Sequence, residues 1–229
     1  MAIKYAARPV VAAPQGLALG GGCEISLHAS RMQAAAEAYI GLVETGVGLI
    51  PAGGGTKEML IRANERAAGG EDLDLFHALK PIFENVAMAK VSTSAEEAGA
   101  LGYLRSSDLI SMNRDRQVAD AKQTALAMVR SGYHAPAPAE IRVLGEEFLA
   151  AAKLAIYLLV QGAYASEYDA LVARKLAYVL AGGGITASQS VPEQYILDLE
   201  REAFVSLCGE RKTQERIAFT LKTGKPLRN

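Results

Sequence analysis

Two glycine-rich stretches of this sequence each carry a glutamate. The first, GLALGGGCE, ends at Glu24, and the second, GLVETGVGLIPAGGG, contains Glu44. Glycine lets a backbone approach a ligand closely, and the first N–H groups of a helix favour developing negative charge. Gly21 is thus a candidate donor to a carbonyl oxygen, and paired carboxylates can move protons at carbon or water. The pattern indicates proton transfer next to a carbonyl group.

The elements around these stretches must bring the two glutamates together. Ile25 and Leu27 predict a short helix that begins just after the glycines and places Glu24 in its first turn. The chain rises about 10 Å through such a helix, at about 1.5 Å per residue. It can return through extended segments at 31–36 and 39–43, at about 3.3 Å per residue. The spacing therefore predicts that Glu24 and Glu44 face one pocket.

Each motif taken alone has a commoner structural explanation. A glycine-rich turn before a helix usually serves packing, and a lone glutamate in a first helical turn usually complements the helix dipole. Cys23 has no histidine near it in sequence, so we expect an inert buried thiol. The three histidines have no ligand spacing, and we expect no metal site; they are His28, His77 and His134.

The composition is that of a globular protein with a substantial core. The chain has 229 residues, 50% of them apolar, and a formal net charge of -1. Nearly balanced charge gives no general attraction to nucleic acid or anionic membranes, so neither is an expected partner. The most apolar stretch, FLAAAKLAIYLLVQG, is interrupted by Lys153 and too short to span a membrane. Two distant cysteines and no signal-peptide pattern lead us to expect a reducing, cytoplasmic location.

The order of strand, glycine loop and helix is typical of α/β proteins. The segment 134–139 has two prolines in six residues and is the clearest predicted linker. Ser94 and Glu97 have the spacing of a helix start. Pro81 predicts a kink or break in a helical stretch. Beyond the linker the periodicity predicts helices near 145–162, 166–181, 192–208 and 211–223.

The segments PVVAAPQGLALGGGCE and IGLVETGVGLIPAGGG resemble the crotonase family of enoyl-CoA hydratases and isomerases. The later segments AKVSTSAEEAGALGYLRSSDLISMNRDRQVADAK and ERKTQERIAFTLKTGKPLRN resemble the carboxyl-terminal part of bacterial fused 3-hydroxyacyl-CoA dehydrogenases. The resemblance implies a partial ClpP/crotonase-like α/β core with short strands, followed by a mainly helical carboxyl-terminal region. The linker at 134–139 sets the predicted boundary, which divides the chain into residues 1–134, the core, and residues 135–229, the helical extension.

The resemblance also implies roles for particular residues. Glu24 and Glu44 correspond to the paired acid/base carboxylates, and the Gly21 N–H to one oxyanion donor. Gly20, Gly21 and Ala52 line the substrate. The implied activity is a lyase reaction, the hydration of a trans-2-enoyl-CoA in fatty-acid β-oxidation. The implied partners are the acyl-CoA and further copies of the chain. No cofactor is expected here, because NAD belongs to the dehydrogenase part of such fused proteins.

Two departures from the family pattern qualify this expectation. Ala52 stands where the family usually has a glycine, which an alanine can replace if its φ is negative. The family's strands that precede the Pro9 segment and supply the second oxyanion donor are missing, so we expect weak or no activity from this chain alone. Two alternatives stay open: a non-catalytic assembly fragment, and a crotonase relative that isomerises enoyl-CoA through Glu44.

Overall fold

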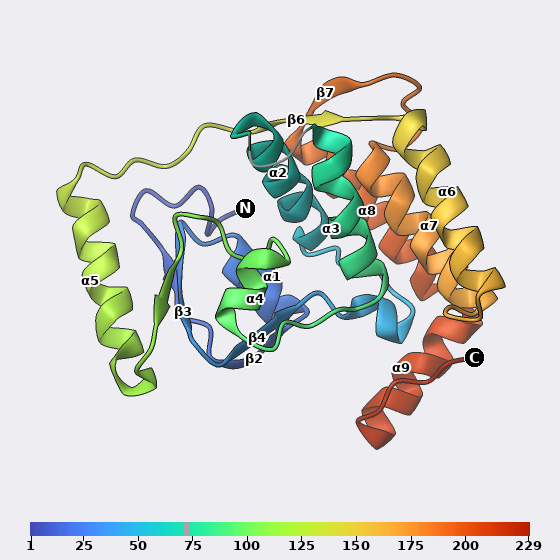
Figure 1. Cartoon of the computed structure of the whole chain (residues 1–229), viewed down its shortest axis with the longest axis horizontal. Helices are drawn as coiled ribbons and strands as arrows, with labels where there is room; N and C mark the ends of the chain where they lie inside the picture. Colours follow the sequence, from blue (N-terminus) through green and yellow to red (C-terminus); the bar gives the residue numbers. More distant parts are fainter. Residues whose placement is uncertain (71–73) are drawn as a thin grey trace. The chain divides into compact units, whose positions relative to one another are not determined.

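The computed structural model describes residues 1–70 and 74–229 (Figure 1). These residues form two compact units, each made of two stretches of chain. The first unit comprises residues 1–42 and 91–138, and the second comprises 43–90 and 139–229. Residues 43–90 are thus grouped by their contacts with the carboxyl-terminal helices. The predicted division between residues 134 and 135 rests on the proline-containing linker instead, and it stays a prediction.

The first unit contains short parallel strands. One sheet has the order β1-β3-β5, and β2 pairs with β4, from Gly16 opposite Ala38 to Leu19 opposite Gly41. The strands are β1 Val11–Ala12, β2 Gly16–Leu19, β3 Arg31–Ala35, β4 Ala38–Gly41 and β5 Leu109–Ser111. Parallel strands need crossover connections, which the intervening helices provide. The predicted α/β class with short strands is confirmed.

The helices of the first unit hold these strands through buried polar and apolar contacts. They are α1 Gly21–Leu27, α4 Ala95–Ala100 and α5 Gln117–Arg130, with a short 3₁₀ turn, η2, at Arg114–Arg116. Gln117 is buried, and its amide donates to the carbonyls of Pro14 and Gln33, each at 2.8 Å. These two buried hydrogen bonds fix α5 against the strand segments at Pro14 and Gln33.

The second unit is almost entirely helical, as predicted for the carboxyl-terminal region. Helix α6 packs on α7, α7 on α8, and α2 on α3 (Figure 1). The elements are η1 Glu44–Val47, α2 Gly55–Ala68, α3 Leu75–Ala87, β6 Glu140–Val143, α6 Glu146–Gln161, α7 Glu167–Ala181, β7 Gln189–Pro192, α8 Glu193–Cys208 and α9 Arg211–Thr223. Helix α3 runs through Pro81, so no break occurs there, and the alternative of a kink stays a prediction.

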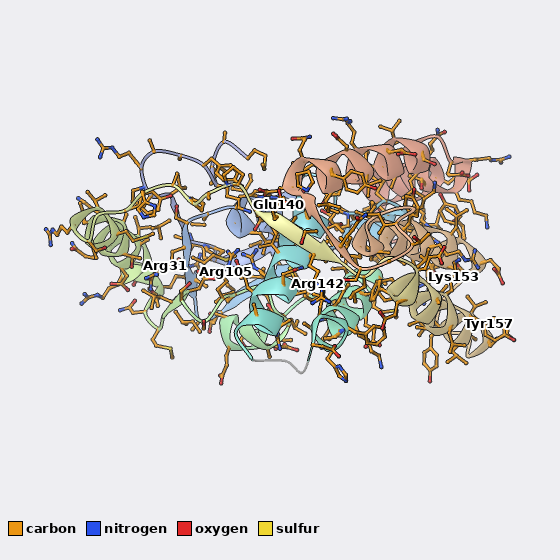
Figure 2. The ribbon with its side chains drawn as sticks, turned by 90° about the horizontal axis from the view of Figure 1, so that it is seen from above. Arg31, Arg105, Glu140, Arg142, Lys153 and Tyr157 are labelled. Atoms are coloured by element: carbon orange, nitrogen blue, oxygen red, sulfur yellow. The ribbon has the colours of Figure 1, made fainter. Side chains whose placement is uncertain are left out.

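Strands β6 and β7 pair antiparallel and so join two segments of the second unit that lie far apart in the sequence. Figure 2 labels Glu140 and Arg142 on β6. Asn64 of α2 bonds the Arg142 backbone twice, accepting from its N–H at 3.0 Å and donating to its carbonyl at 3.1 Å. Phe148 of α6 lies edge-on to Phe76 and Phe83 of α3, with ring centroids 6.1 and 6.0 Å apart. Within the described residues, no helix is long and apolar enough to cross a membrane.

Candidate functional site

The start of α1 brings three of the predicted residues together in the first unit. Gly20 has φ 53° and ψ -124°, a conformation that favours glycine. Its N–H donates to the Gly41 carbonyl at 2.9 Å, and its carbonyl accepts from the Glu24 N–H at 2.9 Å. Gly21 and Gly22 are exposed, and a Cβ built on either would meet nothing within 4 Å. The backbone at this helix start is therefore open to an approaching ligand.

Glu24 is half-buried in the first turn of α1, as predicted. A carboxylate there is favoured by the positive end of the helix dipole. The Glu24 carbonyl is 2.7 Å from Nδ1 of the buried His28, which the helix therefore holds in place. Cys23 is fully buried, as predicted. Among residues 1–70 and 74–229, no group of three or more His, Cys, Asp or Glu side chains is placed to hold a metal ion.

Glu44 opens the 3₁₀ turn η1 in the second unit, where it is half-buried. The turn is closed by backbone hydrogen bonds from Gly48 to Thr45 (3.1 Å) and from Leu49 to Glu44 (3.0 Å). The Thr45 hydroxyl donates to the Val86 carbonyl at the end of α3, at 3.0 Å. The backbone that carries Glu44 is thus fixed by its own hydrogen bonds and by α3.

Ala52 lies in the loop that leads to α2. Non-glycine residues with positive φ in the described parts of the chain are confined to Ala89 (52°) and Ala163 (58°). Ala52 therefore occupies backbone space that alanine tolerates, which satisfies the condition set by the sequence. Gly54, at φ 95°, is the residue of this loop that needs to be glycine.

Glu200 of α8 anchors the same loop, and sequence reasoning missed it. Its Oε2 accepts from the Gly54 N–H at 2.9 Å, and its Oε1 from the Lys57 N–H at 2.5 Å. These are orphan donors at the start of α2. Glu200 is fully buried. A signal exists in retrospect, because Glu200 stands on the apolar stripe that Ile196, Ala203 and Leu207 form at helical spacing.

A group of buried charges adjoins this anchor. The Lys57 ammonium lies 2.5 Å from Glu58 and 2.6 Å from Glu193, and Arg62 lies 3.0 Å from Glu58. All four side chains are at most 3% exposed. Charges are buried in proteins only when they are paired in this way, and breaking one pair leaves an uncompensated charge. The network therefore ties the start of α2 to α8.

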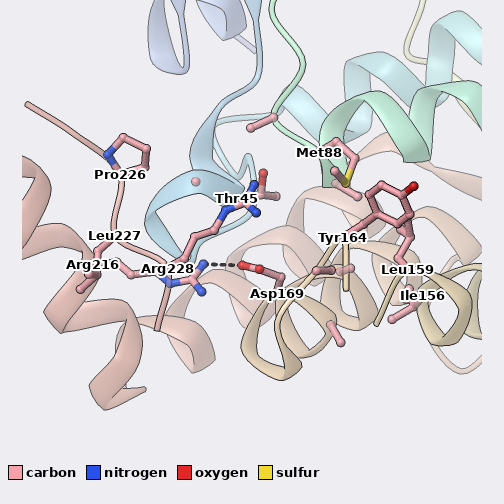
Figure 3. A pocket seen from close by; sticks show the side chains of 16 residues that line it. Thr45, Met88, Ile156, Leu159, Tyr164, Asp169, Arg216, Pro226, Leu227 and Arg228 are labelled. Atoms are coloured by element: carbon pink, nitrogen blue, oxygen red, sulfur yellow. Dashed lines mark hydrogen bonds and ion pairs between the residues drawn. The ribbon is translucent and has the colours of Figure 1, made fainter. Parts of the chain in front are cut away.

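A cavity of about 220 Å³ lies beside the Glu44 turn, within the second unit (Figure 3). Thr45 and Gly46 form part of its wall, Met88, Ile156 and Leu159 give it an apolar lining, and Arg216 and Asp169 pair at 2.7 Å. Burial raises the pKa of Asp169, but hydrogen bonds from Ser166 and Arg216 outweigh it and hold that pKa below its ordinary value. Asp169 and Arg216 thus stay an ion pair at neutral pH.

The predicted residues divide between the two units. Gly20, Gly21 and Glu24 lie together in the first, whereas Glu44 and Ala52 lie in the second. The structure thus groups the glycine donor with one carboxylate, and the role of each residue stays a prediction.

Comparisons with known proteins bear on both halves of the chain. Residues 1–70 match the family model described as enoyl-CoA hydratase/isomerase. A Bacillus subtilis (strain 168) protein named as a probable 3-hydroxyacyl-CoA dehydrogenase is 49% identical over 229 residues, all of this chain and 28% of that protein. A Rickettsia felis protein, whose name assigns it provisionally to the trifunctional enzyme of a fatty acid oxidation complex, is 26% identical over 96% of this chain and 27% of its own length. The chain thus spans less than a third of these relatives.

Solved structures add evidence on the fold. The crystal structure of an enoyl-CoA hydratase from Mycobacterium avium subsp. paratuberculosis K-10 matches with a TM-score of 0.53 and 20% identity, covering 100% of this chain and 68% of that one. Identity this low speaks only to the fold, which is that of crotonase-type proteins. The chain thus carries, at residues 1–70, the sequence pattern of the enoyl-CoA hydratase/isomerase family on a crotonase-type fold.

Proposed function

We propose that this chain is the enoyl-CoA hydratase part of a fatty-acid β-oxidation 3-hydroxyacyl-CoA dehydrogenase. The observation that carries the proposal is the start of α1, where an open backbone at Gly21 adjoins a carboxylate in the first helical turn. The names of the Bacillus and Rickettsia relatives supply the dehydrogenase and fatty-acid context. The substrate is then a trans-2-enoyl-CoA and the product a 3-hydroxyacyl-CoA.

In the proposed reaction each residue has one task. The Gly21 N–H donates to the thioester oxygen as negative charge develops on it. The oxygen of a water bonds to the β-carbon while Glu24 accepts a proton from that water. Glu44 delivers a proton to the α-carbon, and the two carboxyl groups then return to their starting states by proton exchange with solvent. Gly20, Gly21 and Ala52 contact the substrate, and the step needs no dissociable cofactor.

The proposal places both glutamates at one site. The Gly20 N–H binds the Gly41 carbonyl, and Glu44 comes three residues after Gly41. Three residues span at most about 11 Å. The covalent link from the glycine-rich helix start to Glu44 is therefore short, which the proposed reaction requires.

Self-association belongs to the same proposal. Three large apolar side chains of α6 are each more than half exposed: Leu154, Tyr157 and Leu158. Figure 2 labels Tyr157 and Lys153 on this helix. Exposed apolar groups of this kind favour contact with another protein surface, and we propose a second copy of the chain in a cytoplasmic homo-oligomer.

The test is turnover of a short trans-2-enoyl-CoA, followed by loss of the conjugated thioester absorbance. Glu24→Gln and Glu44→Gln are each expected to lower kcat by at least about 100-fold, because a positioned acid or base contributes about 10²–10⁴-fold. Glu37→Gln is the matched control, since Glu37 is exposed in the first unit, and it should leave kcat unchanged.

The outcomes separate the alternatives. Turnover that depends on both glutamates supports the hydratase. Dependence on Glu44 alone, with double-bond migration as the product, would replace it by an isomerase. A folded sample that does not bind acyl-CoA in calorimetry would contradict the proposal and favour the assembly fragment. Binding without turnover is the result expected if the chain alone is inactive.

A further inference from the structure

Two buried hydroxyl groups form a hydrogen-bonded chain that ends on the Glu44 turn. The Thr213 hydroxyl of α9 donates to the Gly48 carbonyl at 2.6 Å. The Tyr168 hydroxyl of α7 lies 2.6 Å from the same Thr213 oxygen. A hydroxyl has one proton, and a carbonyl can only accept. Because Thr213 donates its proton to Gly48, Tyr168 must be the donor to Thr213, and the direction of both hydrogen bonds is fixed.

The two hydrogen bonds end at Gly48, the residue that closes the Glu44 turn. Gly48 donates to the Thr45 carbonyl, and Leu49, next in sequence, donates to the Glu44 carbonyl. Gly48 has φ 81°, and a Cβ there would lie 2.7 Å from the Thr213 oxygen. The hydroxyl thus occupies the space that only a glycine leaves, and α9 is in contact with η1 at this point.

Tyr168, at the other end of the two hydrogen bonds, is also held in place. The Arg216 guanidinium lies over the Tyr168 ring, 5.0 Å from its centroid, and Lys212 approaches the same ring at 5.6 Å. Arg216 also pairs with Asp169, the residue after Tyr168. Thr213 is fully buried and Tyr168 nearly so. The ring therefore has little freedom to turn its hydroxyl away from Thr213.

We infer that Thr213 is a positioning residue for Glu44. Its hydroxyl, oriented by Tyr168, holds the Gly48 carbonyl and thereby the backbone on which the Glu44 side chain is mounted. The catalytic consequence rests on the proposed function, whereas the restraint on the turn does not. A residue outside the 1–70 family match thus sets the geometry of a proposed acid/base group inside it.

The first test is amide hydrogen exchange at Gly48 and Leu49 in the whole chain. Thr213→Val removes the hydroxyl at nearly constant shape, and the Leu49 amide should exchange about tenfold faster, with the interior amides of α6 unchanged. Thr213→Ser restores the hydroxyl and should stay within about twofold of the wild type. The matched control is Thr223→Val on the same helix, whose hydroxyl donates to the Phe219 carbonyl.

Two results would overturn the inference: unchanged Leu49 exchange in Thr213→Val, or equal acceleration in Thr213→Ser. If Thr213→Val does not fold, Tyr168→Phe takes its place, because it removes only the donor to Thr213. That variant should accelerate Leu49 exchange about threefold, and an unchanged rate would equally overturn the inference.

The second test is kinetic. Thr213→Val should lower kcat about tenfold with KM within about twofold, and Thr213→Ser should recover most of the loss. Faster exchange with unchanged kcat would overturn the positioning role. A wild-type chain without turnover is compatible with the weak or absent activity expected of this chain alone, and the exchange rates would still decide whether Thr213 holds the turn.

Discussion

At the level of single residues, Gly48 is held where no other residue fits. It has positive φ and has the Thr213 hydroxyl where a Cβ would be, whereas Gly46, two residues earlier, has nothing within 4 Å of that position. We expect Gly48→Ala to lower the free energy of unfolding by about 2 kcal/mol, and Gly46→Ala by less than about 1 kcal/mol. Urea denaturation measures both, and equal effects would contradict the argument.

Glu200 carries a second prediction at this scale. Glu200→Ala removes the acceptor from the Gly54 and Lys57 amides and leaves two buried donors without it. Each buried donor left unsatisfied costs about 1–3 kcal/mol. Glu202→Ala on the same helix is exposed and should change the free energy of unfolding by less than about 0.5 kcal/mol. Similar urea midpoints for the two variants would show that the anchor is dispensable.

Single residues also show what a sequence reveals about a site. The start of α1 was predictable because its glycines and the apolar spacing of the helix are neighbours in the sequence. Glu200 and Thr213 were not, because each acts on a backbone group about 145 or more residues away. A glutamate and a threonine on a helix are ordinarily read as surface residues, and only the tertiary contact gives them a role.

Among the elements, helix α7 is expected to make a contribution to stability that depends on pH, through the residues of its first turn. The Ser166 side chain caps the helix by accepting from the Asp169 N–H. The Asp169 carboxylate in turn accepts from the Ser166 N–H, which completes a capping box, and it pairs with Arg216. The pKa of Asp169 is lower in the folded chain than its ordinary value of 3.8. The stabilisation is therefore present above pH 3.8 and is lost as the pH falls below it, through the folded-state pKa.

Asp169→Asn should accordingly lower the free energy of unfolding by about 2 kcal/mol at pH 7 and by much less at pH 2. The control is Asp198→Asn, which breaks an exposed pair with Arg201 and should cost less than about 1 kcal/mol at either pH. Urea unfolding at both pH values measures this, and a pH-independent loss for Asp169→Asn would refute the ion-pair explanation.

The predicted elements agree with the structure where their causes are local. The helices expected near 166–181, 192–208 and 211–223 begin and end within about one residue of α7, α8 and α9. Ser94 caps α4 as expected by accepting from the Glu97 N–H. The Glu97 carboxylate accepts from the Thr93 N–H. Strands β6 and β7 were missed, because each is four residues long and their pairing joins segments 45 or more residues apart. Such pairing leaves no periodic signal in either segment.

For the whole molecule, the discontinuous units predict the result of a cut in the linker. Residues 135–138 contain two prolines, lie outside helices and strands, and are mostly exposed. A specific protease site inserted after Ala137 should be cleaved readily in the native protein. We expect the two fragments to co-elute on a sizing column, because residues 43–90 and 139–229 share one compact unit. Separate elution would instead support independent domains divided at 134/135.

This grouping was beyond the reach of the sequence. The prolines mark a linker, but nothing in residues 43–90 says which later segment they pack against. The contacts that decide it include the Glu200 anchor on Gly54 and the Asn64 bonds to Arg142, both long-range. Composition and periodicity report on neighbours along the chain, and so they located the elements without assigning them to units.

The interleaved order of the units has a consequence for biosynthesis. Helices α2 and α3 leave the ribosome well before α8, which ends at Cys208, 118 residues after Lys90. At 5–20 residues per second this delay is roughly 6–24 s. During that time α2 lacks its packing against α8, and the cation of Lys57 lacks the carboxylate of Glu193. The nascent chain is therefore expected to depend on holding chaperones in this interval, and slowed translation before α8 should increase its aggregation.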